Sequence, residues 1–283
     1  MVQILQKRAP ALTIRAGHLA RELILEQGLQ PEQVDIVPGA AGGPKGIGIQ
    51  GLDQAIFGEF FLRAPQRRTL VGSSIGSWRF ASMAAHGVQQ GTERLGELYT
   101  NLYFHKKMTR QDVSEVCRGM LLDLVQGKEN DLVNHPDYHL AVISIKAQHI
   151  FQSDKALPLL ASVAGILGTT AVARRHSRYF MQRVISQPNI GEQFKIAEDG
   201  FTTHYHALTE QSVLSWLMAS ASIPGVMAAV NNIPDAPQGY YRDGGLIDYH
   251  IDLPFQSKGI VLYPHFTDSI TPGWFDKLFK RTS

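Results

Sequence analysis

Cysteine is almost absent from this chain of 283 residues, which contains only Cys117. One thiol cannot form an internal disulfide, nor can it supply the several ligands of a thiolate metal cluster. An excess of either charge is also absent, because 27 basic residues face 25 acidic ones. The net charge of +2 gives no indication of nucleic-acid binding. A hydrophobic content of 44% fits a soluble globular protein with a sizeable core.

The N-terminus lacks the apolar run of a signal peptide. We expect instead an amphipathic first helix over residues 12–27, within an N-terminal helical extension of residues 1–30. Residues 156–173 contain no charged side chain, but their proline and glycines make a poor membrane span. With the basic residues that follow, residues 156–185 predict an apolar and basic helical segment, which is buried, lines a cleft or faces lipid.

Strand and helix signals alternate along the first third of the chain. Residues 34–37 and 68–71 have the composition of short buried strands, and residues 47–61 and 75–86 have that of helices. This alternation predicts an α/β fold, with parallel strands, right-handed crossovers and helices on both faces. Further strands are expected at residues 139–147, 203–208 and 259–263, helices at 93–103 and 112–125, and a loop at 232–239.

Residues 72–76 read Gly-Ser-Ser-Ile-Gly, the G-x-S-x-G pattern of a serine held at a sharp turn between a strand and a helix. Gly72 and Gly76 remove side chains that would clash in such a turn. The N-terminus of the following helix would lie beneath the oxygen of Ser74. The pattern alone also fits an ordinary turn of glycine and serine, so its context has to decide.

A glycine- and alanine-rich run at positions 39–46 directly follows the first expected strand and predicts a turn. Backbone N–H groups in such a bend can converge on one point, which is what a developing oxyanion requires. Pro44 has no N–H, so the candidate donors are Gly42 and Gly43. The N–H of Ile75, next to the serine, is a third candidate.

Two phosphate-binding patterns compete for the same region. A P-loop needs serine or threonine after its Gly-Lys pair, and this chain has Gly46 after Lys45. A dinucleotide-binding pattern matches by letter over residues 46–51, but it begins after the turn has ended. Its glycines would then lie inside a helix, where close packing of the helix on the sheet explains them better. A purely structural glycine turn stays open as a further alternative.

Two small-residue motifs appear late in the chain. Residues 219–224 read Ala-Ser-Ala-Ser-Ile-Pro, and residues 243–245 read Asp-Gly-Gly. An aspartate before two glycines predicts a turn, which could hold the carboxylate of Asp243 at a cleft.

Taken in order, residues 41–46, 72–76, 219–224 and 243–245 resemble the motifs of the patatin-like phospholipase family. The resemblance extends from about residue 34 to residue 246, and the ordered set is more specific than any one motif. Two positions depart from the family pattern. Ala41 stands where the family's loop has a third glycine, and Lys45 stands where it has arginine. Lysine keeps the positive charge but loses the planar fork of a guanidinium.

The resemblance implies a three-layer α/β/α fold with a mostly parallel sheet, in a single catalytic domain over residues 1–283. It implies a lipid acyl hydrolase in which Ser74 attacks the ester carbonyl and Asp243 acts directly as the general base. Gly42 and Gly43 would hold the oxyanion. The supporting motif residues would be Lys45, Gly46, Gly72, Gly76, Gly244 and Gly245. No cofactor or metal is implied, and the expected partner is a lipid, reached by peripheral membrane contact of a cytoplasmic protein.

Other arrangements stay open on the sequence alone. The order of residues along the chain, serine then aspartate then histidine, also allows a catalytic triad. In such a triad, the ring of His250 or His265 would stand between the side chains of Asp243 and Ser74. The chain could instead be an inactive lipid-binding protein of the same fold. The pair of Asp248 and Asp252 could suggest a divalent ion, although a solvated turn is the favoured interpretation.

Overall fold

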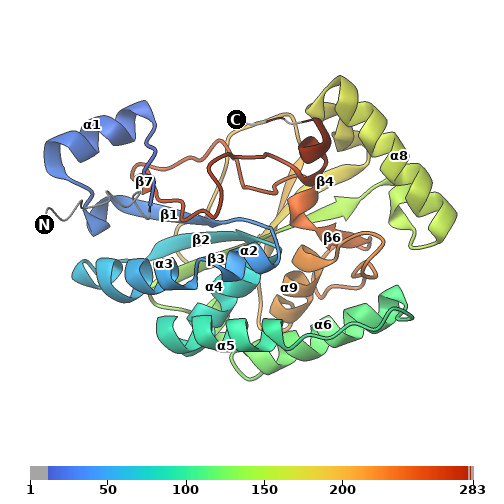
Figure 1. The fold of residues 1–283 in the computed structure, drawn as a ribbon, viewed down its shortest axis with the longest axis horizontal. Coiled ribbons are helices and arrows are strands. Elements are labelled where there is room, and N and C mark those ends of the chain that lie inside the picture. The colour runs from blue at the N-terminus through green and yellow to red at the C-terminus, as the bar shows by residue number, and fades with distance from the viewer. Residues whose placement is uncertain (1–11, 280, 282–283) are drawn as a thin grey trace, which may run out of the picture.

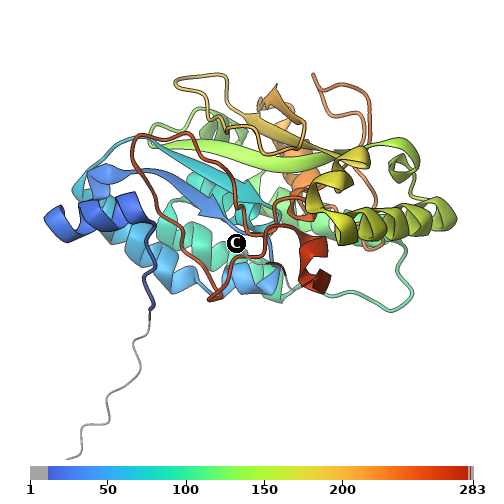
Figure 2. The same ribbon diagram turned by 90° about the horizontal axis from the view of Figure 1, so that it is seen from above.

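The computed structural model of the chain describes residues 12–279 and 281 (Figure 1). The described residues form a seven-stranded sheet with helices on both faces (Figures 1 and 2). The strand order is β5-β4-β3-β2-β1-β7, and β6 pairs with β3 off this path. The predicted α/β fold, with three layers and a mostly parallel sheet, is confirmed.

The strands are β1 (Val34–Gly39), β2 (Arg68–Ser73), β3 (Tyr138–Ala147), β4 (Met181–Gln187), β5 (Thr203–Ala207), β6 (Tyr241–Asp243) and β7 (Ile260–Val261). Strand β1 is parallel to β2 and β7, β2 is parallel to β3, and β4 is parallel to β5. Strand β3 pairs antiparallel with both β4 and β6. These two antiparallel pairings were not predicted.

The helices are α1 (His18–Gln27), α2 (Pro44–Ile47), α3 (Gln50–Ala55), α4 (Ile75–His86), α5 (Val88–Thr100), α6 (Arg110–Val125), α7 (Glu129–Val133), α8 (Ala156–Val172) and α9 (Val213–Ala221). The 3₁₀ helices in the second half of the chain include η5 (Arg174–Tyr179), η6 (Gly244–Leu246) and η7 (Trp274–Phe279). Thr109 caps α6 by accepting the N–H of Asp112, whose carboxylate accepts the N–H of Thr109 in return.

Several predicted boundaries are wrong. Helix α1 begins at His18, later than expected, and residues 1–11 of the predicted N-terminal extension lie outside the described residues. Helix α2 begins at Pro44, inside the bend that was predicted to extend to residue 46, because proline is already preorganised for a first helical turn. The predicted helical segment 156–185 ends in strand β4. That strand was missed because its arginine, Arg183, lies in the interior and not on a solvated helix face.

Side chains alternate between the two faces of the sheet, as the pleat of a strand requires. Leu70, Leu140 and Val142 pack with α4 in the largest hydrophobic cluster. Their neighbours Val71 and Ala141 pack on the opposite face. Further along β3, Ile145 and Ala147 pack with α8. In Figure 1, α3 to α6 and α9 therefore lie on one side of the strands and α8 lies on the other.

Candidate active site

Ser74 lies at the junction where β2 ends and α4 begins. Its backbone has φ 54° and ψ −127°, an uncommon conformation for a residue other than glycine. Such a conformation costs on the order of 1–3 kcal/mol and persists only where the surroundings enforce it. The tight turn predicted from the G-x-S-x-G pattern is present.

The two glycines of this turn are required by close contacts. A Cβ atom at Gly72 would lie 2.5 Å from the backbone N of Ser77. A Cβ atom at Gly76 would overlap the carbonyl group of Gly39, where β1 passes under the start of α4. Both positions therefore exclude a side chain, as the sequence predicted.

Asp243 reaches the serine because β2 and β6 share one edge of β3. Ser73, the last residue of β2, is paired with Ile143, and Asp243, the last residue of β6, is paired with Ser144. Strand β2 runs parallel to β3 and β6 runs antiparallel to it, so the two strands run toward each other. Their carboxyl ends meet at neighbouring residues of β3.

The two side chains are in direct contact. Ser74 Oγ donates a hydrogen bond of 2.8 Å to Asp243 Oδ2, and the N–H of Gly245 donates one of 2.6 Å to Oδ1. Ser74 is 8% exposed and Asp243 6% exposed. Burial raises the pKa of Asp243 to about 7, although the bonds from Ser74 and Gly245 and the charge of Lys277 oppose this rise. A carboxylate with this pKa is a much better proton acceptor than an unperturbed one.

Ser220 holds the backbone of the nucleophile turn. Its Oγ accepts the N–H of Ser74 at 2.9 Å and donates to the carbonyl oxygen of Ile143 at 2.6 Å. Ser77 Oγ also lies 3.2 Å from Ser220 Oγ. The sequence singled out residues 219–224 as a motif, but it did not show that Ser220 contacts Ser74.

The glycine bend at residues 39–46 lies against the turn that carries Ser74 and the turn that carries Asp243. A Cβ atom at Gly245 would lie 2.8 Å from Cβ of Ala41. The N–H of Ala41 donates to the carbonyl oxygen of Tyr249 at 2.8 Å, and Ala41 has no positive φ, so alanine is tolerated in place of glycine. Gly42 and Gly43 have φ of 152° and 58°, which other residues rarely adopt. Within the described part of the chain, neither of their N–H groups has a hydrogen-bond acceptor.

The supporting residues of the motifs have distinct positions. Lys45 is exposed on α2, and no ion-pair partner for it is found among the described residues. Gly46 allows α2 to approach α4, because a Cβ atom there would lie 2.8 Å from the side chain of Ile75. Gly244 permits the close approach of η6 to β3, where a Cβ atom would meet the backbone of Ile143.

One cation near the site was missed. Lys277 in η7 places its Nζ 3.4 Å from the ring centroid of Tyr249, the residue that binds Ala41. Burial lowers the pKa of Lys277 to about 8; the charge of Lys45 also lowers it, and that of Asp243 raises it. Residue 277 follows the last expected strand by many residues, and no pattern in the sequence connects it with the dyad.

Neither histidine of the alternative triad contacts the dyad. His250 Nδ1 accepts the N–H of Thr271 at 2.9 Å, and its ring stacks on Tyr249. The His265 ring lies 4.4 Å from that of His250. Burial lowers the pKa of His250 to about 3 and that of His265 to about 4, so both rings are neutral at pH 7. Over residues 12–279 and 281, no histidine hydrogen bonds with Ser74 or Asp243.

A family model of patatin-like phospholipases matches residues 48–251, which include both Ser74 and Asp243. The chain belongs to the patatin-like phospholipase family. This is a family of lipid acyl hydrolases. The glycine bend at residues 39–46 precedes the matched region. Comparisons with curated proteins and with solved structures gave no match.

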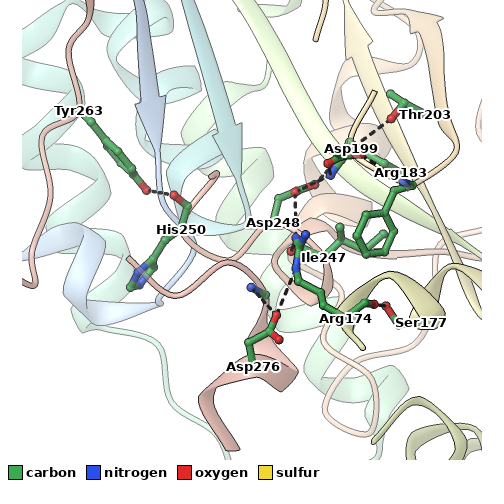
Figure 3. Close-up of polar contacts among 12 residues, drawn as sticks. Arg174, Ser177, Arg183, Asp199, Thr203, Ile247, Asp248, His250, Tyr263 and Asp276 are labelled. Atoms are coloured by element: carbon green, nitrogen blue, oxygen red, sulfur yellow. Dashed lines mark hydrogen bonds and ion pairs between the residues drawn. The ribbon is translucent and has the colours of Figure 1, made fainter. Parts of the chain in front are cut away.

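In this member of the family, a buried ion-pair network fixes the segment that follows Asp243 (Figure 3). Asp248 accepts two hydrogen bonds from Arg183, of 2.6 and 2.9 Å, and Arg183 also pairs with Asp199 at 2.7 Å. Arg174 approaches Asp248 at 3.8 Å and pairs with Asp276 at 3.2 Å. The favoured interpretation of Asp248 as part of a solvated turn was wrong, because it is fully buried.

The described residues contain no group of three or more histidine, cysteine, aspartate or glutamate side chains placed to hold a metal ion. Asp248, one of the two carboxylates considered for a divalent ion, is instead bound by arginine. The site as described consists of a buried serine and carboxylate, free backbone N–H groups and two lysines nearby.

Proposed function

We propose that the chain hydrolyses acyl esters of phospholipids or related lipids with Ser74 as nucleophile and Asp243 as general base. The observation that carries the proposal is the hydrogen bond of 2.8 Å from Ser74 Oγ to Asp243 Oδ2. A serine hydroxyl needs a base within hydrogen-bond reach, and here the carboxylate is that base without an intervening histidine.

In the first half of the reaction, Asp243 Oδ2 takes the proton of Ser74 as Oγ attacks the carbonyl carbon of the ester. The negative charge develops on the carbonyl oxygen. When the tetrahedral intermediate collapses, the C–O bond to the alcohol breaks, and Asp243 returns the proton to the departing oxygen. The acyl group is left on Ser74 as an ester.

In the second half, a water molecule replaces the alcohol. Asp243 takes one proton from this water as its oxygen attacks the acyl carbon. Collapse of the second intermediate breaks the bond to Ser74 Oγ, which recovers the proton, and releases the fatty acid. The buried position of Asp243 supports this role, because a pKa near 7 balances proton uptake against proton release.

The N–H groups of Gly42, Gly43 and Ile75 are the proposed donors to the oxyanion. The N–H of Ser74 is not available for this purpose, because it is bound to Ser220. Ile75 is the first residue of α4, where the N–H groups of a helix lack partners within the helix. The positive end of the α4 dipole adds to the stabilisation of a negative charge.

Labelling with a fluorophosphonate probe, followed by mapping of the modified residue, tests this proposal. We expect a single adduct on Ser74 in the wild type and none in Ser74→Ala. Turnover of a short p-nitrophenyl ester should be lost in Ser74→Ala and in Asp243→Asn, with both variants folded. His250→Ala and His265→Ala should retain most of the activity, and loss of activity in either would favour the triad. Binding of lipid without any turnover by the wild type would favour an inactive lipid-binding protein.

A further inference from the structure

Helix α8 carries no charged side chain on the face that it buries or on the face that it exposes. The residues that it buries are Leu159, Ser162, Ile166 and Thr170. Leu159 and Ile166 pack toward β3 and β4 in the second hydrophobic cluster of the protein. The hydroxyl of Ser162 is satisfied by the helix itself, since it donates to the carbonyl oxygen of Pro158 at 2.7 Å.

The exposed side chains of α8 form one continuous stripe. Leu157, Leu160 and Val172 are 80%, 68% and 75% exposed. The other exposed positions toward the same side are Ala161, Ala164, Gly168 and Ala171. Counted from Leu157, these positions follow spacings of three and four residues, which place them on one side of a helix. The stripe contains no polar side chain.

A water-exposed helix ordinarily carries charged and polar residues on its outer face. A stripe of this length without any is typical of a surface that contacts another apolar phase or partner. The described residues contain no helix that is long and apolar enough to cross a membrane. We therefore expect a partner to cover the stripe along its length.

The exposed charges that flank α8 directly in the chain are all positive. Lys155 precedes the helix and is exposed, and Arg175 and Arg178 follow it and are also exposed. No acidic residue occurs between Asp154 and Glu192. Asp154 is itself paired with the buried Arg242 at 2.9 Å. An apolar stripe with cations at both ends complements a surface that is apolar inside and anionic outside, which is the description of a bilayer containing anionic lipids.

The helix is also joined to the segment that carries the carboxylate of the dyad. Arg174, two residues after the end of α8, points inward and donates to the carbonyl oxygen of Ile247 at 2.7 Å (Figure 3). Ile247 follows Asp243 by four residues. Helix η7, which presents the half-exposed Trp274, lies beside the end of α8, where Arg281 donates to the carbonyl oxygen of Ala171 at 3.1 Å (Figures 1 and 2).

We propose that the exposed stripe of α8 docks on the surface of a bilayer that contains anionic phospholipids, with the helix axis in the plane of the bilayer. The stripe enters the apolar region while Lys155, Arg175 and Arg178 contact the lipid phosphates. This inference deepens the proposed function and rests on it, because docking would hold the dyad close to lipid esters.

Flotation of the full chain with vesicles of ether-linked lipids tests the proposal. Ether lipids have no acyl ester, so binding is measured without turnover, and a result is obtained even if the proposed hydrolysis fails. We expect the wild type to float with phosphatidylcholine vesicles that contain phosphatidylglycerol, and far less with phosphatidylcholine alone. The double variant Leu157→Asp/Leu160→Asp should bind at least about tenfold more weakly. Arg175→Gln/Arg178→Gln should weaken binding by roughly 10- to 30-fold, at about 1 kcal/mol for each charge.

Leu62→Asp is the matched control, because Leu62 is also 68% exposed but precedes β2, at the end of the sheet away from the dyad. This variant should bind vesicles like the wild type. A wild type that does not float with anionic vesicles would overturn the proposal. So would a double variant that floats as well as the wild type. A wild-type dimer that Leu157→Asp/Leu160→Asp converts to a monomer, without vesicle binding, would show that a second copy covers the stripe.

Discussion

Ser220 Oγ accepts the backbone N–H of Ser74 at 2.9 Å. The same hydroxyl donates to the carbonyl oxygen of Ile143 at 2.6 Å, so the nucleophile turn is tied to β3 at the residue that pairs with the end of β2. Ser74 has a positive φ, and this bond helps to enforce it. Ser220 is therefore a positioning residue, which acts on the reaction through Ser74.

Replacing Ser220 with alanine removes the acceptor of a buried N–H group. We expect Ser220→Ala to lower the free energy of unfolding by about 1–3 kcal/mol. We also expect kcat for a short soluble ester to fall roughly tenfold, because the hydroxyl of Ser74 is no longer held in line with its base. KM should change little, since Ser220 is fully buried and out of reach of the substrate. Urea denaturation and steady-state kinetics measure the two effects.

Ser222→Ala is the control for this prediction. Ser222 is equally buried, and its Oγ donates to the carbonyl oxygen of Met218 at 2.8 Å without contacting Ser74. The control should lose some stability and keep its kcat. Equal losses of kcat in both variants would mean that Ser220 has no specific role in positioning.

The raised pKa of Asp243 predicts the pH dependence of the reaction. A general base works only when it is unprotonated, so kcat/KM should rise with pH and level off above a pKa of about 7. An unperturbed aspartate would give a flat profile from about pH 5 upward. The measurement is kcat/KM for a neutral soluble ester over a series of pH values. The stability of the enzyme is checked at each pH. A flat profile down to pH 5 would argue against Asp243 as the base.

The charge of Lys277 holds this pKa down, so its removal should move the profile. In Lys277→Met the acidic limb should shift to higher pH by a few tenths of a unit to about one unit. Lys258→Met is the matched control, because Lys258 is also exposed but precedes β7, whose Ile260 pairs with Val34 at the other end of the sheet. A downward shift, or the same shift in the control, would contradict the assignment.

The sequence predicted the parts of this site whose signal is local. The glycines at positions 72 and 76 indicate a tight turn because only glycine fits there. In the structure, a Cβ atom at either position would clash with backbone atoms. The parallel core of the sheet was predictable from buried strands that alternate with helices. The contact between Ser74 and Asp243 was predicted only through a family resemblance, since the two residues are far apart in the chain.

What escaped prediction depends on contacts between distant segments. Strand β6 is three residues long and exists because β3 offers a free edge beyond the end of β2. Strand β4 was taken for part of a helical segment because Arg183 suggested a solvated face, and its partners Asp199 and Asp248 are recognisable only in three dimensions. Lys277 likewise carries no local signal of its position against Tyr249.

A base that is buried for catalysis should also weaken the fold. The pKa of Asp243 rises from 3.8 to about 7 on folding, so the folded state binds the proton more tightly and loses stability as pH rises from about 4 to 7. The full shift of about three units corresponds to roughly 4 kcal/mol as an upper limit. Asp243→Asn keeps a side chain that can bond to Ser74 and Gly245 but carries no charge. We expect it to be about 1–4 kcal/mol more stable than the wild type at pH 8.

The pH dependence distinguishes this effect from a general change in packing. The difference in melting temperature between Asp243→Asn and the wild type should be largest above pH 7 and should shrink toward zero near pH 4. A difference that is the same at every pH would show that ionisation of Asp243 is not its cause.

The ion pair between Arg183 and Asp248 should contribute far more to stability than an exposed pair. Both side chains are fully buried, so Asp248→Asn leaves the Arg183 guanidinium in the interior with only part of its compensating charge. Removing one partner of a buried pair typically costs about 3–5 kcal/mol. Lys128→Met removes the exposed pair with Asp131, which is 3.4 Å long, and should cost less than about 1 kcal/mol. Urea midpoints of the two variants measure the contrast, and equal small losses would mean that Asp199 alone compensates Arg183.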